Sequence, residues 1–320
     1  MPYRASIIIV SYNNWQTTTQ DCLSSLVADD ANQGVEIIVV DNNSTDETLA
    51  MLRSFESEYP NIKVILNKEN RGFAGGNNDG VRHASGDIVI LLNSDTVVPV
   101  GAVGKLSSML ADHPDWDMLG PVTNQAGNEQ KISIEPADIE TEMAEGERWT
   151  RCSNSDSFES RRLDFCCVAV KKDVYDALGG LDEAYGLGYY EDTDFSLKAL
   201  SQGRKMVFTD AVFVYHKAGQ SFSSHGEEQV RRLMRKNRKL LKAKFNQGFE
   251  LRHIRDCNLN VLKQYAAFFQ HKTENRAYMD NLIYRFNKRL AFARTLYPTN
   301  PFKKIRYHLA LNSVSSKIRR

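Results

Sequence analysis

The sequence predicts an α/β protein with a mostly parallel central sheet, followed by a basic helical region. Through residues 1–225, short β-branched runs alternate with helix-like segments, which is the pattern of a largely parallel sheet. After about residue 226 the apolar side chains recur at helical spacing instead. The charge also changes sign, because residues 1–230 hold 18 Lys or Arg against 36 Asp or Glu, whereas residues 231–320 hold 23 against 4. We therefore expect two parts, 1–225 and 226–320, with different surfaces.

Continuous apolar runs mark strands that are buried on both faces, and capped amphipathic segments mark helices. The expected strands are Ser6–Val10, Glu36–Val40, Lys63–Leu66, Ile88–Leu92 and Phe165–Val170. The expected helices are Thr17–Val27, Glu47–Tyr59, Ala74–His83, Gly101–Asp112 and Asp173–Leu178, the last ending at Gly179-Gly180. The polar stretch 126–160 is expected to be an irregular loop.

The basic region carries two apolar faces at helical spacing, with Arg and Lys on the opposite faces. The first contains Val230, Leu233, Met234, Leu240, Leu241 and Phe245, and the second contains Tyr278, Met279, Leu282, Ile283, Phe286 and Leu290. Three interpretations stay open: docking on the preceding domain, contact with an anionic membrane surface, or binding of polyanions such as nucleic acid.

Composition limits the class of protein. An apolar content of 42% and a charged content of 25% are typical of a soluble globular chain. No apolar run approaches the ~20 residues that a membrane-spanning helix needs, and the amino terminus lacks the layout of a signal peptide. Five cysteines without a CxxC pair suit a reducing compartment. We therefore expect a cytoplasmic protein.

Polar residues follow three of the expected strands, as Ser11-Tyr12-Asn13, Asp41-Asn42-Asn43-Ser44 and Asn93-Ser94-Asp95. The carboxyl ends of parallel strands meet at one edge, where ligands bind. No GxGxxG follows the first strand and no GxxxxGK[ST] occurs, which disfavours the dinucleotide and P-loop types of phosphate site.

Several motifs in a fixed order give the chain a family resemblance. They are IIIVSYNN (7–14), VVDNNSTDET (39–48), NRGFAGGNNDG (70–80), LLNSD (91–95), GGLDEAYGLGYYEDTDFSLKA (179–199) and VYHKAGQSF (214–222). Over residues 5–225 the sequence resembles an inverting family 2 glycosyltransferase with the GT-A fold, a Rossmann-like nucleotide-binding domain, in the rhamnosyltransferase/galactofuranosyltransferase-like subgroup. The resemblance makes 1–225 the catalytic domain and 226–320 a basic helical C-terminal extension.

The resemblance implies a site for a nucleotide-sugar donor. Its expected residues are Ser11, Asp41, Arg71, Asn77, Asn93 and Asp95. The Asp41 carboxylate would accept the imide N–H of uracil or thymine, and Arg71 would pair with phosphate or stack on the base. Structural interpretations remain for each: Asp41 suits a turn, Ser44 to Glu47 form a capping box, and 70–78 suit a Gly-rich turn.

The resemblance also implies a divalent metal, Mn²⁺ or Mg²⁺, on the donor diphosphate. Asp95 and His216 would be its ligands. Asn93 stands where the family usually has a carboxylate, so it would contact ribose or sugar instead. A lone histidine at a strand end is otherwise more often structural.

The resemblance makes Asp192 the catalytic base that takes the proton of the acceptor hydroxyl, with Tyr190 and Glu191 in supporting, acceptor-side positions. Direct displacement with inversion needs one such base, unlike a retaining glycosidase, which needs two flanking carboxylates. Acidic residues at a helix start are also ordinary dipole partners, an interpretation that suits Glu191 and Asp194. Asp194 is expected to fold inward.

The leading hypothesis is therefore a metal-assisted hexosyltransferase that uses a UDP- or dTDP-sugar and a glycan or lipid-linked acceptor in cell-envelope polysaccharide biosynthesis. Among the interpretations of residues 231–320, contact with an anionic membrane surface is preferred, which makes the protein peripheral at the inner face of the membrane. Nucleic acid is not an expected partner. The alternatives are a nucleotidyltransferase and a non-catalytic protein that binds sugar nucleotides.

Overall fold

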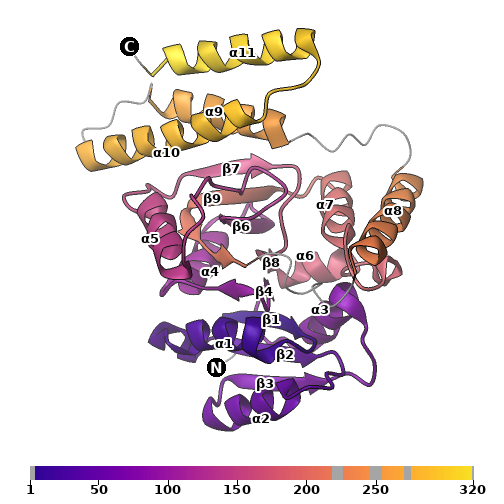
Figure 1. Cartoon of the computed structure of the whole chain (residues 1–320). Coiled ribbons are helices and arrows are strands. Elements are labelled where there is room, and N and C mark those ends of the chain that lie inside the picture. Colours follow the sequence, from indigo (N-terminus) through magenta and orange to yellow (C-terminus); the bar gives the residue numbers. More distant parts are fainter. Residues whose placement is uncertain (1–3, 218–225, 246–253, 270–274, 319–320) are drawn as a thin grey trace.

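A computed structural model describes residues 4–217, 226–245, 254–269 and 275–318. Its main sheet has the strand order β3-β2-β1-β4-β8-β6-β9-β7, and β10 pairs with β5 in a small second sheet (Figure 1). The strands are β1 Ala5–Ser11, β2 Glu36–Asp41, β3 Ile62–Leu66, β4 Ile88–Asn93, β5 Thr96–Val97, β6 Met118–Val122, β7 Ser157–Ser160, β8 Cys167–Lys171, β9 Met206–Phe213 and β10 Tyr215–His216. The helices of the α/β part are α1 Gln20–Val27, α2 Thr48–Glu58, α3 Gly72–His83, α4 Ala102–Asp112, α5 Ile139–Thr150, α6 Lys172–Ala177 and α7 Glu191–Ser201.

The central sheet is mostly parallel, as expected from the alternation of strands and helices. β1 lies between β2 and β4 and runs parallel to both, and β6 runs parallel to β9. Only β8, between β4 and β6, and the edge strand β7 run the other way. The chain therefore changes direction of winding at β1 and β4, which is the switch point where open α/β sheets form their crevice.

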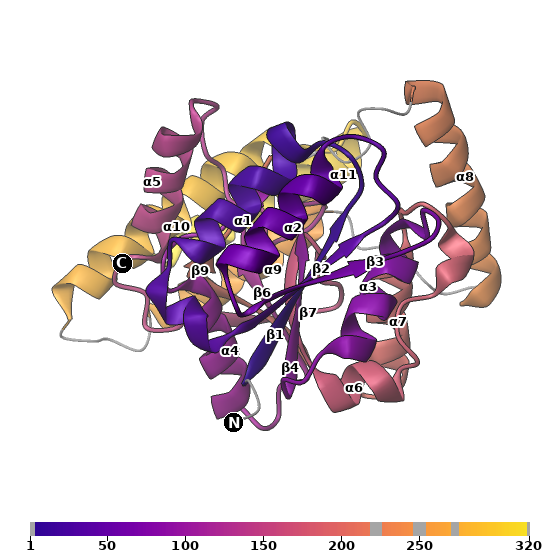
Figure 2. The same cartoon turned by 90° about the horizontal axis from the view of Figure 1, so that it is seen from below.

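Both faces of the sheet are buried, which explains the uninterrupted apolar strands. Ile7 and Ile9 of β1 belong to one core cluster with residues of α1, α2 and α4. Ile8 belongs to another, with residues of α3, α6 and α7. Viewed from below, these two groups of helices lie on opposite sides of the strands (Figure 2). In β1, β2 and β4, the polar side chains therefore lie at or near the strand ends.

The stretch 126–160 is not an irregular loop as expected. It contains helix α5, whose start is capped by Asp138 accepting the Thr141 N–H at 2.8 Å, and the edge strand β7. The helix is mostly exposed and acidic, with Trp149 buried in the core and Met143 packed against that core while partly buried. Because so few apolar residues face inward, the helical period was hidden in a polar composition.

Two helix boundaries test the expected caps. Gly179 and Gly180 both adopt positive φ after α6, and the Gly180 N–H donates to the Tyr175 carbonyl, so the expected C-cap is confirmed. The prediction of a capping box at the start of α2 is wrong. Ser44 Oγ accepts the Asn13 N–H at 2.8 Å instead, and Asp46 accepts the N–H of Thr48.

The basic region folds into four helices among the described residues: α8 Glu227–Lys244, α9 Ile254–Phe268, α10 Arg276–Thr295 and α11 Pro301–Ser316. Helices α9 to α11 stack beyond the β7 end of the sheet, with α11 outermost, and their apolar side chains continue the core cluster of the α3 face. Within the described part of the chain, no helix is long and apolar enough to span a bilayer.

The buried face of α10 agrees only in part with the face expected from the helical spacing of its apolar residues. Ile283 is exposed, whereas Arg285 and Arg289, expected on the solvent side, are buried. Two buried carboxylates explain this. Arg285 pairs with Asp156 at 2.5 Å and with Asp210 at 3.1 Å.

The second arginine completes a hydrogen-bonded network. Arg289 lies 3.4 Å from Asp210 and donates to the Glu129 carbonyl at 2.8 Å. Asp210 also accepts hydrogen bonds from Trp149 and Tyr265. Buried charges persist only when they are paired and hydrogen-bonded in this way, so the network fixes how α10 docks on β9.

This network predicts a large loss of stability for Arg285→Met. The substitution roughly keeps the side-chain volume but removes the positive charge that pairs with the buried carboxylates of Asp156 and Asp210. The free energy of unfolding should therefore fall by about 3–5 kcal/mol. Urea denaturation measures it. Arg294→Met on the exposed side of the same helix is the control and should change stability by less than about 0.5 kcal/mol. Equal effects of the two substitutions would contradict the assignment.

Candidate active site

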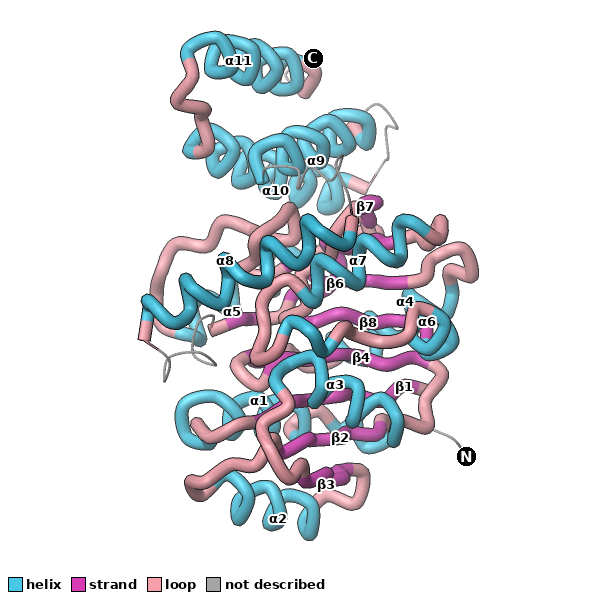
Figure 3. The backbone as a smooth tube through the Cα atoms, turned by 90° about the vertical axis from the view of Figure 1, so that its right-hand side faces the viewer, coloured by secondary structure: helices cyan, strands magenta, loops and turns pink. Residues whose placement is uncertain are grey.

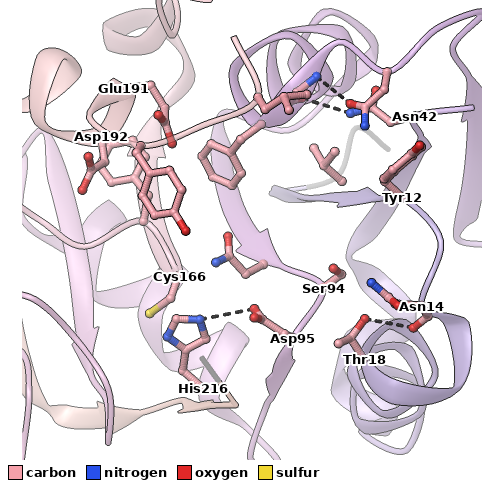
Figure 4. A pocket seen from close by; sticks show the side chains of 18 of the residues that line it. Tyr12, Asn14, Thr18, Asn42, Ser94, Asp95, Cys166, Glu191, Asp192 and His216 are labelled. Carbon is pink, nitrogen blue, oxygen red and sulfur yellow. Dashed lines mark hydrogen bonds and ion pairs between the residues drawn. The ribbon is translucent and has the colours of Figure 1, made fainter. Parts of the chain in front are cut away.

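A pocket of about 320 Å³ opens at the carboxyl edge of the sheet, at the switch point between β1 and β4. This is within the usual size range of ligand sites. It is lined by Val10, Tyr12, Asn13, Asn14, Thr18, Asn42, Asn70, Gly72, Phe73, Asn93, Ser94, Asp95, Asp164, Phe165, Cys166, Leu187, Tyr189, Glu191, Asp192 and His216. Figure 4 shows Glu191 and Asp192 on one side of it, with Asp95 and His216 on a wall of their own.

The two-stranded sheet brings Asp95 and His216 together although they are far apart in the sequence. His216 of β10 is paired with Thr96 of β5. The His216 ring therefore reaches the carboxylate of Asp95, the residue before Thr96. His216 Nε2 lies 3.2 Å from Asp95 Oδ1, and Nδ1 lies 3.1 Å from the Gln125 carbonyl. That carbonyl can only accept, so Nδ1 carries a proton and Nε2 faces the carboxylate.

This wall fits a divalent cation. When the His216 imidazole is neutral, its Nε2 lone pair and Asp95 Oδ1 lie 3.2 Å apart and can bind the same cation. Asn93 Oδ1 is buried nearby without a hydrogen-bond partner among the described residues. These are ligand types that Mn²⁺ or Mg²⁺ accepts. No cluster of three His, Cys, Asp or Glu occurs in the described ranges, so further ligands would come from the bound substrate and water.

Without a cation the same pair is held as an ion pair. Burial alone would lower the pKa of His216, but the Cys166 sulfur and the Asp95 carboxylate outweigh it and raise that pKa far above its usual range.

Glu191 and Asp192 begin α7 and bring two carboxyl groups to one wall of the pocket. Burial, and next the charge of Asp192, raises the pKa of Glu191 to about 8. Burial also raises the pKa of Asp192, while Arg162 and hydrogen bonds from Thr193 oppose the rise. Two adjacent buried acids cannot both ionise cheaply. Glu191 therefore keeps its proton near neutral pH and Asp192 carries the charge.

The segment before α7 has an unusual backbone. Gly186, Tyr189 and Tyr190 all have positive φ, at 69°, 70° and 80°, and for the two tyrosines this conformation is costly. A close approach adds to the constraint. Gly72, at φ 67°, faces this segment so tightly that a Cβ would lie 2.2 Å from the Gly186 carbonyl oxygen, which only glycine avoids.

Helix α8 holds the segment in place. The buried Asn237 side chain donates from Nδ2 to the carbonyl oxygens of Tyr185 and Gly188, each at 2.8 Å, and of Tyr189 at 3.1 Å. Lys244, on the same helix, pairs with Asp182 at 2.6 Å and with the buried Asp194. Figure 3 shows α8 lying across α7. Asp194 thus folds inward, as expected.

Comparison with known proteins identifies the family. The model of the family described as Glycosyl transferase family 2 matches residues 6–179, more than half of the chain. The chain belongs to glycosyl transferase family 2.

Relatives and solved structures agree with this family. The chain is 41% identical over 102 residues to the uncharacterized glycosyltransferase YfnE of Bacillus subtilis, covering 32% of this chain and 26% of that protein. It is 26% identical over 166 residues to an N-acetylglucosaminyltransferase of Azorhizobium caulinodans, covering 51% of this chain and 40% of that one. The chain thus spans less than half of these relatives.

The mannosyltransferase PcManGT from Pyrobaculum calidifontis, solved with GDP-Man and Mn²⁺, has the same fold. It superposes with a TM-score of 0.53 at 18% identity, covering 99% of this chain and 77% of that one. The likeness shows the GT-A fold, as the motifs led us to expect.

The residues expected at the site of this family 2 chain divide into two groups. Asn93, Asp95, Glu191, Asp192 and His216 line the pocket together. The others are not among the residues that line the pocket, and they contact neighbouring protein groups. They are Ser11, Asp41, Arg71, Asn77 and Tyr190. The 218–222 part of the last motif lies outside the described residues.

Each residue of the second group has a structural partner. Arg71 pairs with Asp79 and lies 2.6 Å from Glu183, and Asn77 donates to the Phe73 carbonyl at 2.9 Å. Ser11 Oγ lies 3.0 Å from Thr19 Oγ1, and Asp41 accepts the Ser44 N–H at 3.2 Å. Tyr190 packs against the small cluster of Tyr185, Leu197 and Leu241.

Several pocket residues of this family 2 domain were not assigned a role from the sequence. Tyr12 and Asn42 belong to the polar strand ends that the parallel-sheet rule places at the ligand-binding edge, and both line the pocket there, although no role was assigned to either. Asp164 and Cys166 precede β8 and reach the pocket because β8 is antiparallel to β4. Strand direction leaves no mark on an apolar run, so the sequence carried no signal for them.

We expect Asn237→Ala to loosen the segment 185–190. Loss of its hydrogen bonds to three carbonyls should cost about 1–3 kcal/mol of stability and speed amide exchange in peptides covering 185–192. Hydrogen exchange followed by mass spectrometry measures this directly. Lys236→Ala, an exposed neighbour on α8, serves as control. Faster exchange throughout α8 without a change at 185–192 would refute the role of Asn237.

The raised pKa of Glu191 predicts a pH-dependent stability difference. The folded protein binds this proton up to pH about 8, whereas the unfolded chain releases it near pH ~4.3. The wild type therefore loses stability relative to Glu191→Gln as pH rises from about 4 to about 8, and the difference levels off above that. Urea midpoints of both proteins at several pH values test this. A difference that stays constant with pH would show that Glu191 titrates normally.

Proposed function

We propose that the chain is an inverting, metal-assisted glycosyltransferase of the hexosyl type, moving a sugar from a UDP- or dTDP-linked donor to a hydroxyl of a glycan or lipid-linked acceptor. One observation carries the proposal. A single pocket at the switch point of the sheet combines the Asp95–His216 pair with the Glu191–Asp192 pair on another wall. The first suits a diphosphate with its cation, and the second suits an acceptor hydroxyl.

Asp192 is the proposed general base. Direct displacement forms a bond from the acceptor oxygen to the anomeric carbon and breaks the bond from that carbon to the donor phosphate. The acceptor proton passes to Asp192, whose raised pKa makes it a stronger base than an ordinary carboxylate. Because Glu191 keeps its own proton, Asp192 is the carboxylate of the pair that can accept one.

Asp95 and His216 are the proposed metal ligands, and Asn93 is proposed to contact ribose or sugar. A bound Mn²⁺ or Mg²⁺ would offset the charge that develops on the leaving diphosphate. Through this cation, the Asp95 carboxylate and the His216 imidazole would hold the diphosphate end of the donor at one wall of the pocket. The other end of the donor would then extend along the ends of β1 and β2, toward Tyr12 and Asn42.

For the other residues that the sequence assigned to the donor site, we propose an indirect role. Asp41, Ser11, Arg71 and Asn77 are not among the residues that line the pocket, and their side chains already bind neighbouring protein groups, so direct contact with the donor would require these partners to exchange. We propose that these four residues hold the backbone around the donor pocket in place. A UDP- or dTDP-sugar is favoured by the resemblance to rhamnosyl- and galactofuranosyltransferases, which is carried by the motifs named above.

The acceptor and the location follow from the same proposal. A surface glycan built on a lipid carrier, in cell-envelope polysaccharide biosynthesis, would be met at the inner face of the cytoplasmic membrane. The basic region 231–320 supports peripheral attachment there, because Lys and Arg near an anionic leaflet are each worth ~1 kcal/mol.

Asp192→Asn should lower turnover by about 100-fold or more while donor affinity stays within about threefold. Release of nucleoside diphosphate measures turnover. Thermal shift with UDP-, dTDP- and GDP-sugars, each with Mn²⁺ or Mg²⁺, measures donor binding, because a ligand stabilises the fold in proportion to its affinity. The panel also identifies the nucleotide.

Asp176→Asn, an exposed carboxylate on α6, is the matched control and should retain full turnover. Unimpaired turnover of Asp192→Asn would remove the base assignment. Release of pyrophosphate from a nucleoside triphosphate would replace sugar transfer with nucleotidyl transfer.

A further inference from the structure

The outermost helix, α11, exposes a stripe of large apolar side chains. Phe302, Ile305 and Leu309 are 81%, 59% and 61% exposed. Their spacing of three and four residues places them on one side of the helix. Isolated exposed apolar residues are ordinary, whereas a continuous stripe of them marks an interaction surface. We call these three residues the outer stripe.

The outer stripe is not needed for the packing of α11. The helix already docks through Tyr307, Leu311 and Val314, which are buried in the main core, and the Tyr307 hydroxyl donates to the Ala293 carbonyl at 3.0 Å. With about 3.6 residues per turn, the buried set projects from the side opposite to the outer stripe. The helix therefore has two apolar faces, and the fold uses only one.

The surroundings of the outer stripe are cationic. Arg306 is exposed on the flank of the stripe, and Lys303 and Lys304 are exposed farther round the first turn of the same helix, while α11 itself carries no acidic residue. A partner must therefore offer an apolar layer together with negative charge. A second copy of this chain does not satisfy this. In a two-fold interface the same patch meets itself, which would bring two cationic patches together without an acidic side chain of α11 to compensate them.

The shape of the surface also limits the partner. Figure 1 shows α11 as a single helix at the outer boundary of the molecule, so the outer stripe is a ridge and not a groove. A ridge of this kind matches a soft, flat surface that apolar side chains can enter. Amphipathic helices with Phe and Leu on one face and Lys or Arg beside it lie in membrane interfaces in this way.

We propose that α11 docks on an anionic lipid bilayer, with the outer stripe in the acyl boundary and Lys303, Lys304 and Arg306 among the headgroups. The inference rests on the peripheral location within the proposed function, and it names the surface that provides it. It is independent of the sugar-transfer chemistry.

Phe302→Trp turns the outer stripe into its own reporter. The native tryptophans, Trp15, Trp116 and Trp149, are all buried, so a new exposed indole dominates any response to lipid. Its emission should shift to the blue with vesicles containing phosphatidylglycerol, and the shift should shrink as salt increases. Vesicles of phosphatidylcholine alone should give little or none. No shift with either composition would overturn the proposal.

Two sets of substitutions separate the apolar and charged contributions. Combined Phe302→Ser, Ile305→Ser and Leu309→Ser should abolish co-sedimentation with the anionic vesicles. Combined Lys303→Gln, Lys304→Gln and Arg306→Gln should weaken it by on the order of 100-fold. Val100→Ser removes an equally exposed apolar side chain from the loop before α4 and should bind like the wild type.

Turnover with a soluble acceptor and the thermal midpoint should be unchanged in all of these variants, so loss of vesicle binding is distinguishable from loss of folding or of sugar transfer. Unaltered vesicle binding after the three serine substitutions would overturn the proposal. Concentration-dependent self-association that these substitutions abolish, without vesicle binding, would assign the outer stripe to a second copy instead.

Discussion

The burial of β1, β2 and β4 on both faces is the constraint on which the rest of the structure depends. Alternate residues such as Ile8 and Ile9 enter separate cores, so no position within these strands can hold an uncompensated polar group. Chemistry is therefore displaced to the strand ends, and a parallel arrangement collects those ends at one edge. The pocket at the switch point between β1 and β4 follows from this constraint before any individual side chain is considered.

That reasoning also sets how much of the site the sequence could predict. The runs that end at Asp41 and Asn93 are visible as strands, so Asp95 could be placed at the pocket edge. His216 could be joined to it only through the family motif, because β5 and β10 are two residues each and are too short to have a readable period. Asp164 and Cys166 enter from an antiparallel strand, and strand direction is decided by tertiary contacts.

The basic region shows a second limit of sequence patterns. Asn237 lies in a run of Arg and Lys and has the composition of a solvent-exposed position, yet it is buried and binds three carbonyls next to Glu191. Arg285 and Arg289 likewise belong to a pattern that predicts a solvated face. Their partners, Asp156 and Asp210, are more than 70 residues away in the sequence, and no local period contains that information. The helices and most of the buried apolar face of α10 were predictable here, but the burial of these arginines and of Asn237 was not.

These cases show that one basic composition serves three physical roles in the same region. On α10, arginines are buried because buried carboxylates compensate them. On α8, Lys244 joins the helix to the carboxylates around the start of α7. On α11, exposed cations accompany a stripe of three exposed large apolar side chains. Net charge alone would assign all three helices to one polyanion. The structure instead shows exposed cations together with a stripe of exposed large apolar side chains on α11, which is why the membrane proposal rests on that helix and not on the region as a whole.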